Sequence, residues 1–291
     1  MKNRISIVTP NLNGAVWLGS TMDSIFSADH GGLDYVVIDG GSTDGSQEVI
    51  AARAGRLSHW VSEVDNGLYH ALNKGFAMTV GDIMGWLNSG DYLFPHSLRI
   101  VDDIFTSLPE VQWLTSRIIT FLDAEGRIVK QGLSPGYTRN SFLRGENLPG
   151  FSTGPDAGHI QQEATFWRRG LWERAGGRLD TTLRVAADFE LWARFFPLAR
   201  LCAVTAPLGA FRKHAGQMSA TLRELYLQEA SEVLRRDGGI PDGKILASLR
   251  IYARRALPRV LRPAAVALGL FDSALTCDFD FDRGRWRLGE F

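Results

Sequence analysis

The stretch that most constrains this chain is residues 81–91, with the sequence GDIMGWLNSGD. Residues 83–87 form an apolar run that predicts a buried strand, and the polar sequence NSGD follows at its C-terminal end. Open α/β sheets bind their ligands at this end of their strands. A carboxylate fixed there at Asp91, beside a glycine that permits close approach, suits a divalent cation that carries phosphate oxygens. The alternative is a polar loop in which Asp91 caps the helix that follows.

Three segments upstream share the same construction, a short apolar strand followed by a polar loop. Residues 5–8 precede the loop TPNLNG, residues 35–39 precede GGSTDGS, and residues 59–63 precede VDNG. Helical patterns occupy residues 46–54 and 68–79. This order of strands and helices predicts a parallel sheet that is covered on both faces and whose polar loops open at one edge.

The first loop excludes several classes of nucleotide-binding protein. TPNLNG contains neither the dinucleotide fingerprint G-x-G-x-x-G nor the P-loop pattern G-x-x-x-x-G-K-[ST]. It also lacks the glycines and arginines that a nucleotidyltransferase acting on sugar phosphates would need. The formal net charge of the chain is zero, so we expect no nucleic-acid partner.

Length and composition are those of an ordinary globular protein. The chain has 291 residues, 45% of them hydrophobic, which allows one large domain or two smaller ones. Its cysteines, Cys202 and Cys277, lack metal-type spacing, and we expect them to stay reduced in a cytoplasmic setting. We find no apolar run long enough for a signal-peptide core or a transmembrane helix. We therefore expect a soluble or peripheral protein.

Four segments carry a resemblance to a known family: IVTPNLNG, VVIDGGSTDGS, SEVDNGLYHALNKG and GDIMGWLNSGDYLFPHSL. In this order and spacing they resemble the inverting glycosyltransferases of family 2, specifically the polysaccharide-biosynthesis branch with a GT-A fold. The resemblance covers about three quarters of the chain. It implies an α/β fold with a Rossmann-like, mixed but mostly parallel sheet flanked by helices. It also implies a nucleotide-diphosphate sugar as donor and a saccharide or lipid-linked saccharide as acceptor.

The resemblance assigns roles by position. It implies donor-binding roles for Thr9, Pro10, Asn11, Asp39, Ser42, Asp44, Asp65, Lys74 and Asn88. Asp91 is the implied metal ligand, and His214 is a further candidate for contact with the metal or the diphosphate. Judged from the residues alone, Asp39 and Asp44 could instead cap the turns and helix that follow them. Lys74 and His214 could be ordinary surface residues.

The metal motif departs from the family pattern. NSGD stands where the family commonly has D-x-D-D, so one or two carboxylates are absent. Asn88 still offers a neutral oxygen, but a Mn or Mg ion held by fewer charges should bind more weakly. A divalent cation is the expected cofactor, with weakened affinity.

The best candidate for the catalytic base lies in residues 184–192, RVAADFELW. Apolar side chains at helical spacing bury one face and leave Asp188 near the helix start, where the helix dipole favours its ionised form. AADFELW resembles the family segment A-x-D-[FY]-x-L-W, whose aspartate is the implied base for inverting transfer. The alternative for Asp188 is N-capping, and we expect Glu190 to pair with Arg194 on the surface.

Two other segments, residues 132–158 and the pair Gln162 and Glu163, have weaker assignments. The glycine- and proline-rich stretch 132–158 is long for a loop in a compact domain, and we interpret it as an acceptor-site loop or lid. Gln162 and Glu163 stand where relatives often have His-Gln, so an acceptor-contact role transfers only weakly.

The C-terminal part predicts helices. Residues 221–236 have an amphipathic pattern, and residues 244–262 combine six Lys or Arg residues with no acidic residue. A basic amphipathic helix can lie on an anionic membrane, which would bring the enzyme near lipid-linked acceptors. The alternative is a helix that packs on the catalytic domain with its arginines in solvent.

These observations predict a GT-A domain at residues 1–215, with a nucleotide-sugar half at 1–94 and an acceptor half at 95–215. Residues 216–291 form a C-terminal helical extension. The expected location is the cytoplasm, at or near the inner face of the cell membrane. The function is inverting sugar transfer in surface polysaccharide or glycolipid synthesis. The alternative, suggested by the depleted metal motif, is a non-catalytic nucleotide-sugar-binding or scaffold protein.

Overall fold

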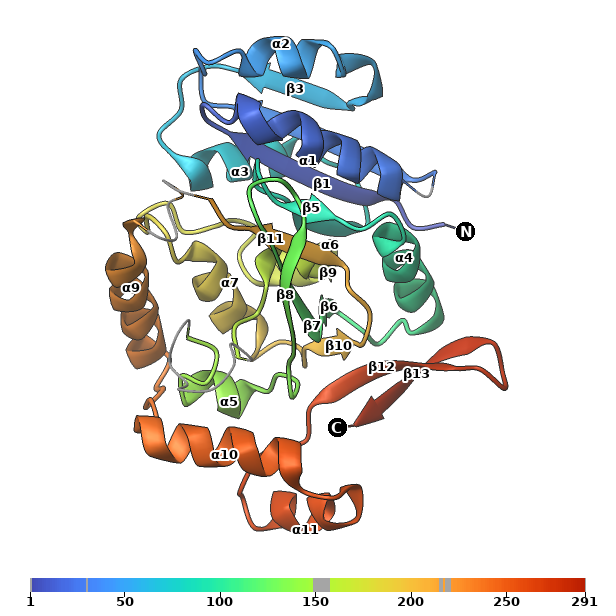
Figure 1. Ribbon diagram of the computed structural model, residues 1–291, viewed down its shortest axis with the longest axis vertical. Coiled ribbons are helices and arrows are strands. Elements are labelled where there is room, and N and C mark those ends of the chain that lie inside the picture. Colours follow the sequence, from blue (N-terminus) through green and yellow to red (C-terminus); the bar gives the residue numbers. More distant parts are fainter. Residues whose placement is uncertain (1, 30, 149–157, 215–216, 218–220, 291) are drawn as a thin grey trace.

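The computed structural model describes residues 2–29, 31–148, 158–214, 217 and 221–290 (Figure 1). Within these residues the strands form a large sheet in the order β13-β12-β10-β6-β9-β4-β1-β2-β3. Their bounds are β1 (Ile5–Asn11), β2 (Leu33–Asp39), β3 (His59–Ser62), β4 (Ile83–Trp86), β6 (Trp113–Ser116), β9 (Phe166–Arg168), β10 (Cys202–Val204), β12 (Leu275–Asp280) and β13 (Arg285–Glu290).

The large sheet is mixed and mostly parallel. Strands β3, β2, β1 and β4 run parallel to one another, as do β6, β10 and β12, whereas β9 and β13 run antiparallel to their neighbours. A smaller sheet has the order β5-β11-β7-β8. Its strands are β5 (Tyr92–Leu93), β11 (Gly209–Arg212), β7 (Ile118–Leu122) and β8 (Ile128–Leu133). The predicted α/β fold with a mostly parallel sheet is confirmed.

Helices cover both faces of the large sheet (Figure 1). Their bounds are α1 (Ala15–Ala28), α2 (Ser46–Ala51), α3 (Leu68–Ala77), α4 (Ser97–Ser107), α5 (Arg139–Leu143), α6 (Arg169–Arg174), α7 (Ala187–Phe195), α9 (Arg223–Arg236), α10 (Lys244–Ala256) and α11 (Arg262–Ala267). Side chains alternate across β1, so Ile7 packs in one core with α1 and α4, whereas Val8 packs in the other with α3, α7 and α9. The two apolar faces hold the strand ends in fixed register.

Two stretches of the sequence do not form single elements in the structure. The strand-like run at residues 111–120 is divided between two strands, β6 and β7, which belong to different sheets. The hydroxyl of Ser116 between them bonds to the backbone of Ile118 and Ala206, which turns the chain from one sheet to the other. The helical stretch expected at 244–262 ends at Ala256, because Pro258 follows and disfavours helix in the residue before it.

The C-terminal part is less helical than predicted. Beyond its helices it contributes β12 and β13, which extend the large sheet. Residues of α9 and β12 pack into the same two cores as the N-terminal strands. The domain boundary at residue 216 stays a prediction.

The expectation of two reduced cysteines is wrong for this structure. Cys202 on β10 and Cys277 on the neighbouring β12 form a disulfide, with their Cα atoms 6.3 Å apart. No local pattern indicates this pairing, because 75 residues separate the two cysteines and the hairpin that carries Cys277 was not predicted. The bond joins the C-terminal hairpin to the central sheet.

Candidate functional site

Four polar side chains meet at the C-terminal ends of β1, β2 and β3, and we call them the Asp39 cluster: Asn11, Asp39, Ser42 and Ser62. The strand register places Asn11 opposite Asp39, and Asp39 opposite Ser62. Asp39 accepts hydrogen bonds from Asn11 Nδ2 (2.7 Å), from the backbone N and Oγ of Ser42 (3.0 and 2.6 Å) and from Ser62 Oγ (2.6 Å). Burial alone would raise the pKa of Asp39, but these hydrogen bonds outweigh it and hold the pKa below its ordinary value. The carboxylate therefore stays ionised at neutral pH.

The first loop lies directly over this cluster. Thr9 and Pro10 are buried in β1, where Thr9 Oγ1 accepts a hydrogen bond from the Tyr35 hydroxyl (3.0 Å). Asn11 Oδ1 is buried without a partner among the described residues, so it remains open to a ligand. A Cβ on Gly14 would lie 2.4 Å from Asn11 Oδ1 and 2.9 Å from Ser89 Oγ. The lack of a side chain at Gly14 thus allows the first loop and the NSGD segment to meet.

The other predicted donor-binding residues have local partners. Asp44 is exposed and accepts hydrogen bonds from the backbone N of Ala15 (2.9 Å) and from Ser46 Oγ (2.6 Å), at the starts of α1 and α2. Asp65 accepts from Gly67 N (2.8 Å), and Lys74 forms an ion pair with Glu63. The capping role is therefore realised for Asp44. The donor-binding roles of all three residues stay predictions.

A second group, the Asp91 cluster, surrounds the end of β4 and consists of Asn88, Asp91, Gln162, Glu163 and Arg212. Asp91 is 5% exposed, and its Oδ1 accepts a hydrogen bond from the backbone N of Arg212 (3.1 Å). The Arg212 guanidinium donates to the carbonyl of Gly90 (2.6 Å). Burial raises the pKa of Asp91 to about 7, because the hydrogen bonds to it offset only part of its desolvation.

Gln162 and Glu163 reach this cluster from a short 3₁₀ turn, Gln162–Ala164, that precedes β9. Gln162 donates to the carbonyl of Trp86 (2.5 Å) and accepts from Asn88 Nδ2 (3.2 Å). Glu163 is buried and accepts from Gln161 Nε2 (2.6 Å). Burial, together with the negative charges of Asp91 and Asp188, raises the pKa of Glu163 well above its ordinary value. Sequence reasoning gave these two residues only a weak acceptor-contact role.

The residues at the end of β4 fit a loosely held cation. The described part of the chain has no cluster of three or more His, Cys, Asp or Glu residues suited to a metal. Asn88 Oδ1, however, is buried beside the Asp91 carboxylate and has no hydrogen-bond partner within the described part of the chain. Mg²⁺ is commonly held by one or two protein oxygens with the rest from phosphate and water, which this pair could supply. The ring of His214 stacks on Trp17 at 3.9 Å, and its role as a ligand stays a prediction.

Asp188, the predicted base, is the second residue of α7. Ala186 occupies the N-cap position of this helix, so Asp188 does not serve as the N-cap. Asp188 Oδ1 is buried and has no hydrogen-bond partner among the described residues. Burial raises the pKa of Asp188 to about 6, against the effect of the nearby backbone N–H groups, and the charge of Glu229 adds to the rise. The site therefore contains a carboxylate with a free acceptor atom and a pKa close to neutrality.

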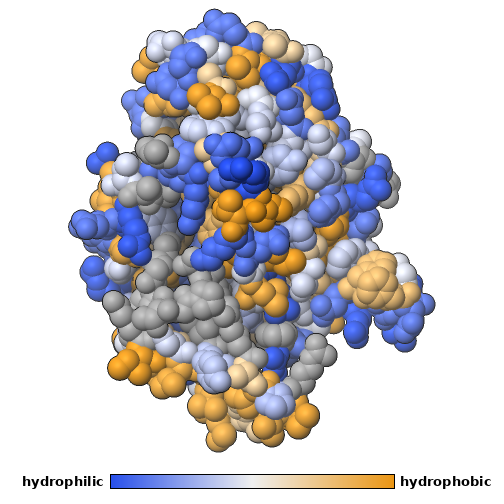
Figure 2. Space-filling model, viewed as in Figure 1, coloured by the Kyte–Doolittle hydropathy of each residue, from blue (hydrophilic) through white to orange (hydrophobic). Residues whose placement is uncertain are grey.

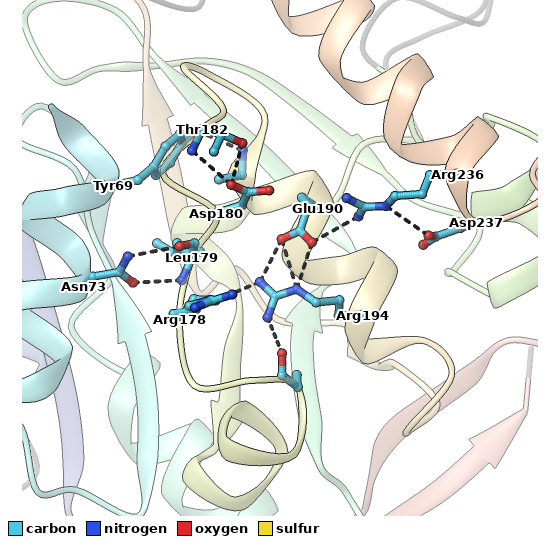
Figure 3. A network of polar contacts seen from close by, with 12 residues as sticks. Tyr69, Asn73, Arg178, Leu179, Asp180, Thr182, Glu190, Arg194, Arg236 and Asp237 are labelled. Atoms are coloured by element: carbon cyan, nitrogen blue, oxygen red, sulfur yellow. Dashed lines mark hydrogen bonds and ion pairs between the residues drawn. The ribbon is translucent and has the colours of Figure 1, made fainter. Parts of the chain in front are cut away.

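Polar contacts link α3 to the loop before α7, and α7 to α9 (Figure 3). Asn73 of α3 exchanges hydrogen bonds with the backbone of Leu179 (2.8 and 3.0 Å), and this fixes the loop that leads to α7. Glu190 pairs with Arg194 (2.7 Å) as predicted, and also with Arg236 of α9 (3.1 Å). Glu190 is only 4% exposed, so the expectation of a surface pair is wrong. The pair instead ties α7 to the C-terminal part.

The predicted acceptor loop, 132–158, is only partly within the described residues. Its beginning forms the end of β8 and the helix α5, whereas residues 149–157 lie outside the described part. Its function as a lid stays a prediction.

Comparison with known proteins agrees with this geometry. Residues 6–154 match the model of the family described as glycosyl transferase family 2. The uncharacterized glycosyltransferase MT1564 of Mycobacterium tuberculosis is 33% identical over 192 residues, which are 65% of this chain and 68% of that protein. The uncharacterized glycosyltransferase alr2836 of Nostoc is 29% identical over 105 residues, or 35% of this chain. That match spans only 33% of the Nostoc protein.

Solved structures show the same fold at low identity. Staphylococcus aureus TarS, residues 1–349 with UDP-GlcNAc, superposes with a TM-score of 0.61 at 15% identity, covering 92% of this chain and 79% of that one. The mannosyltransferase PcManGT of Pyrobaculum calidifontis, with GDP-Man and Mn²⁺, gives 0.56 at 18% identity, covering 93% and 81%. The chain therefore belongs to glycosyl transferase family 2, a family of nucleotide-sugar-dependent glycosyltransferases, and has the GT-A type of fold.

Proposed function

We propose that this chain is an inverting glycosyltransferase. It moves a sugar from a nucleotide-diphosphate donor to a hydroxyl of a saccharide or lipid-linked saccharide, in the synthesis of a surface polysaccharide or glycolipid. The observation that carries this proposal is Asp188, whose buried Oδ1 has no protein partner among the described residues. Although burial raises the pKa of this carboxylate to about 6, it is still mostly ionised at neutral pH, and the higher pKa makes it basic enough to accept a proton.

The transfer is a single displacement. Asp188 accepts the proton of the acceptor hydroxyl while the hydroxyl oxygen forms a bond to the anomeric carbon. The bond from that carbon to the donor phosphate breaks on the opposite face, and the nucleoside diphosphate leaves with the electron pair. One carboxylate is sufficient for this step, which agrees with the unpartnered oxygen of Asp188.

Donor recognition is assigned to the Asp39 cluster and the loops beside it. Asp39 is ionised and accepts two hydrogen bonds on each oxygen, from Asn11, Ser42 and Ser62, so a ribose or base donor would have to replace one of these partners. Asn11 Oδ1 adds an acceptor that has no protein partner in the described chain. The donors UDP-GlcNAc and GDP-Man of the two structural relatives belong to the class that such a site accepts. We leave the nucleotide and the sugar open.

The diphosphate would lie by the Asp91 cluster. Lys74 is already paired with Glu63, and the Arg212 side chain donates to the carbonyls of Gly90 and Ala124 and to Ser20 Oγ. These partners favour a divalent cation, held by Asp91 and Asn88, as the main source of positive charge. Such an ion would neutralise charge that develops on the leaving diphosphate. The structure of PcManGT contains Mn²⁺, which supports the same choice here.

Peripheral membrane contact is the remaining part of the proposal. Among the described residues no helix combines the length and apolar character needed to span a bilayer. Exposed apolar side chains instead gather on α10, α11 and their connection, at the lower end of the molecule in Figure 2. They include Ile245, Leu249, Tyr252, Val260 and Leu268. Arg250 does not face solvent freely, because it pairs with Asp242 (3.0 Å) and donates to Leu270 O (2.8 Å).

Liposome co-sedimentation tests this contact. We expect binding to vesicles that contain anionic lipid and little binding to neutral vesicles, because residues 244–262 are basic. The triple variant Ile245→Ser, Leu249→Ser, Tyr252→Ser should lose binding. Val16→Ser combined with Val64→Ser, at apolar residues exposed elsewhere, is the matched control. Equal binding by the triple variant and the control would refute the contact.

The experiment that tests the enzymatic proposal is the substitution Asp188→Asn. We expect transfer activity to fall by about 10²- to 10⁴-fold, the usual contribution of a general base. Donor-induced thermal stabilisation should persist, because the Asp39 cluster is unchanged. Asp282→Asn, at an exposed carboxylate, is the control. Full activity of Asp188→Asn would refute the base, and wild-type protein that binds donor without hydrolysis or transfer would favour the scaffold alternative.

A further inference from the structure

The start of α7 is held by two elements from distant parts of the sequence. Successive backbone N–H groups at Arg184, Val185 and Ala186 donate to the carboxylate of Glu229, at 2.9, 3.1 and 3.0 Å. The next N–H, that of Ala187, donates to the Tyr69 hydroxyl of α3 at 3.2 Å. The first N–H groups of any helix lack partners within the helix. Here the Tyr69 phenol of α3 accepts from Ala187, the first residue of α7, and the Glu229 carboxylate of α9 accepts from the N-cap residue and the two residues before it.

This arrangement replaces an ordinary cap. The N-cap residue, Ala186, has no side chain that could accept a hydrogen bond. Glu229 lies on α9, which packs against α7 and buries Ala230, Val233 and Leu234 in the shared core. The carboxylate is therefore carried by a rigid helix. Its distance from α7 is set by apolar packing rather than by a flexible loop.

Asp188 directly follows the four N–H groups that are held in this way. The backbone conformation of 184–187 thus decides where its unpartnered Oδ1 points. The ionisable groups around it are Glu229 and Tyr226 of α9, Tyr69 of α3 and Glu163 of the 3₁₀ turn. Among them Glu229 contributes a negative charge that disfavours ionisation of Asp188. Glu229 therefore affects both the position and the pKa of the predicted base.

We propose that Glu229 is a positioning residue, which fixes the three residues that lead into α7 and thereby aims the Asp188 carboxylate at the acceptor hydroxyl. This inference rests on the proposed function of Asp188 as base. It makes α9 part of the active site, although sequence analysis places residue 229 in an extension outside the catalytic domain. The C-terminal part is then required for turnover and not only for docking.

The test is Glu229→Gln, with Glu232→Gln as matched control, because Glu232 is exposed on the same helix. The amide of the variant offers one acceptor atom and turns an N–H₂ group towards backbone donors, so the first turn of α7 should shift. A small displacement of a catalytic group can cost up to about 100-fold in rate, and we expect kcat to fall by about 10- to 100-fold. The KM for donor should not change, because the hydrogen bonds of Glu229 go to the backbone of residues 184–186 and not to the Asp39 cluster.

The pH profile separates positioning from a purely structural role. Activity requires ionised Asp188, so kcat/KM rises with pH through its pKa. Removal of the Glu229 charge lowers that pKa, and the acid limb of the Glu229→Gln profile should move to lower pH. Glu229→Asp keeps the charge but shortens the reach. It should therefore lower kcat while the acid limb stays at the wild-type position.

These results can be told apart from failure of the proposed function. If Asp188→Asn is inactive while Glu229→Gln has wild-type kcat and an unmoved acid limb, the positioning role is refuted and the base stands. If Asp188→Asn is fully active, the base itself is refuted. Should Glu229→Gln fail to fold, Glu229→Asp decides, because wild-type kcat in that variant would also overturn the inference.

Discussion

Two carboxylates of the candidate site, Asp39 and Asp188, differ in almost every physical respect. Asp39 accepts hydrogen bonds from Asn11, Ser42 and Ser62, and its pKa lies below the ordinary value. Asp188 has one oxygen without a partner among the described residues, and burial raises its pKa to about 6. The first is stabilised as an anion by its surroundings. The second is an anion that its surroundings disfavour.

The difference separates binding from reaction. A carboxylate that recognises a ligand must hold one position and one charge, and a dense set of hydrogen bonds provides both. A carboxylate that accepts a proton must keep a lone pair free and a pKa near the working pH, which costs stability in the resting protein. Asp91 and Glu163 share the second environment, since burial raises the pKa of each. We therefore divide the site into two halves. In the stabilising half, the Asp39 cluster, hydrogen bonds favour the ionised carboxylate. In the destabilising half, Asp91, Glu163 and Asp188, burial disfavours it.

The largest effect on stability should come from the stabilising half. In Asp39→Asn, one of the two acceptor oxygens becomes an N–H₂ group. Either the donors to Oδ1 (Asn11 Nδ2 and Ser42 Oγ) or the donors to Oδ2 (Ser42 N and Ser62 Oγ) then face another donor. We expect a loss of about 3 kcal/mol in the free energy of unfolding, measured by urea denaturation at pH 7. The pKa of Asp39 in the folded protein lies below its value near 3.8 in the unfolded chain, so this stabilisation is fully present above pH 3.8. It is lost only as the pH falls through the pKa of the folded state. Unchanged stability at pH 7 would contradict the assignment.

Asp188→Asn should change stability in the opposite direction. The native state holds the Asp188 proton more tightly than the unfolded chain, so wild-type stability falls as pH rises from about 3.8 to about 6. The interval between these values sets an upper limit of about 3 kcal/mol, and partial exposure reduces it to about 2 kcal/mol. The variant should be more stable by that amount at pH 7 and equal to wild type below pH 3.8. A variant less stable than wild type at pH 7 would remove the contrast with Asp39.

A smaller effect on stability is expected for Glu163→Gln, which tests whether Glu163 behaves like Asp188 or like Asp39. The substitution removes a carboxyl group whose ionised form is disfavoured by burial and by the charges of Asp91 and Asp188, while the new amide can still accept the hydrogen bond from Gln161 Nε2. We expect the free energy of unfolding at pH 7 to rise by about 1 kcal/mol. Chemical denaturation of Glu163→Gln beside Gln161→Ala is the measurement. Destabilisation by both variants would show that Glu163 belongs to the stabilising half.

The nucleotide-sugar half of the fold is well predicted from sequence, for a physical reason. Apolar strands followed by polar loops specify a parallel sheet locally, and the ends of neighbouring strands must then meet at one edge. Asn11 and Asp39 lie opposite each other, as expected from this geometry. The order of the strands alone therefore predicts that these two side chains lie close together.

The rest of the site depends on contacts that leave no local pattern. Arg212 and Asp91 are 121 residues apart, and Glu229 and Arg184 are 45 apart, so neither pair has a spacing that could be recognised. Glu163 is a single charge on a short 3₁₀ turn, and only its burial shows that it joins the cluster. The Cys202–Cys277 bond depends likewise on strand order within the sheet. Sequence reasoning identified the carboxylates but not the residues that set their basicity.

An effect as small as that of Glu163→Gln is expected at Asp44, where an experiment can separate helix capping from donor binding. Its hydrogen bonds to Ala15 N and Ser46 hold the starts of two helices, so Asp44→Ala should cost about 1 kcal/mol of stability, as loss of a helix cap does. If capping is its whole role, the KM for donor will equal that of wild type at a temperature well below unfolding. Asp44→Asn, which keeps an acceptor oxygen, should recover part of the stability. A rise in donor KM in both variants would place Asp44 with Asp39 among the residues that bind the donor, and would extend the stabilising half to the exposed rim of the site.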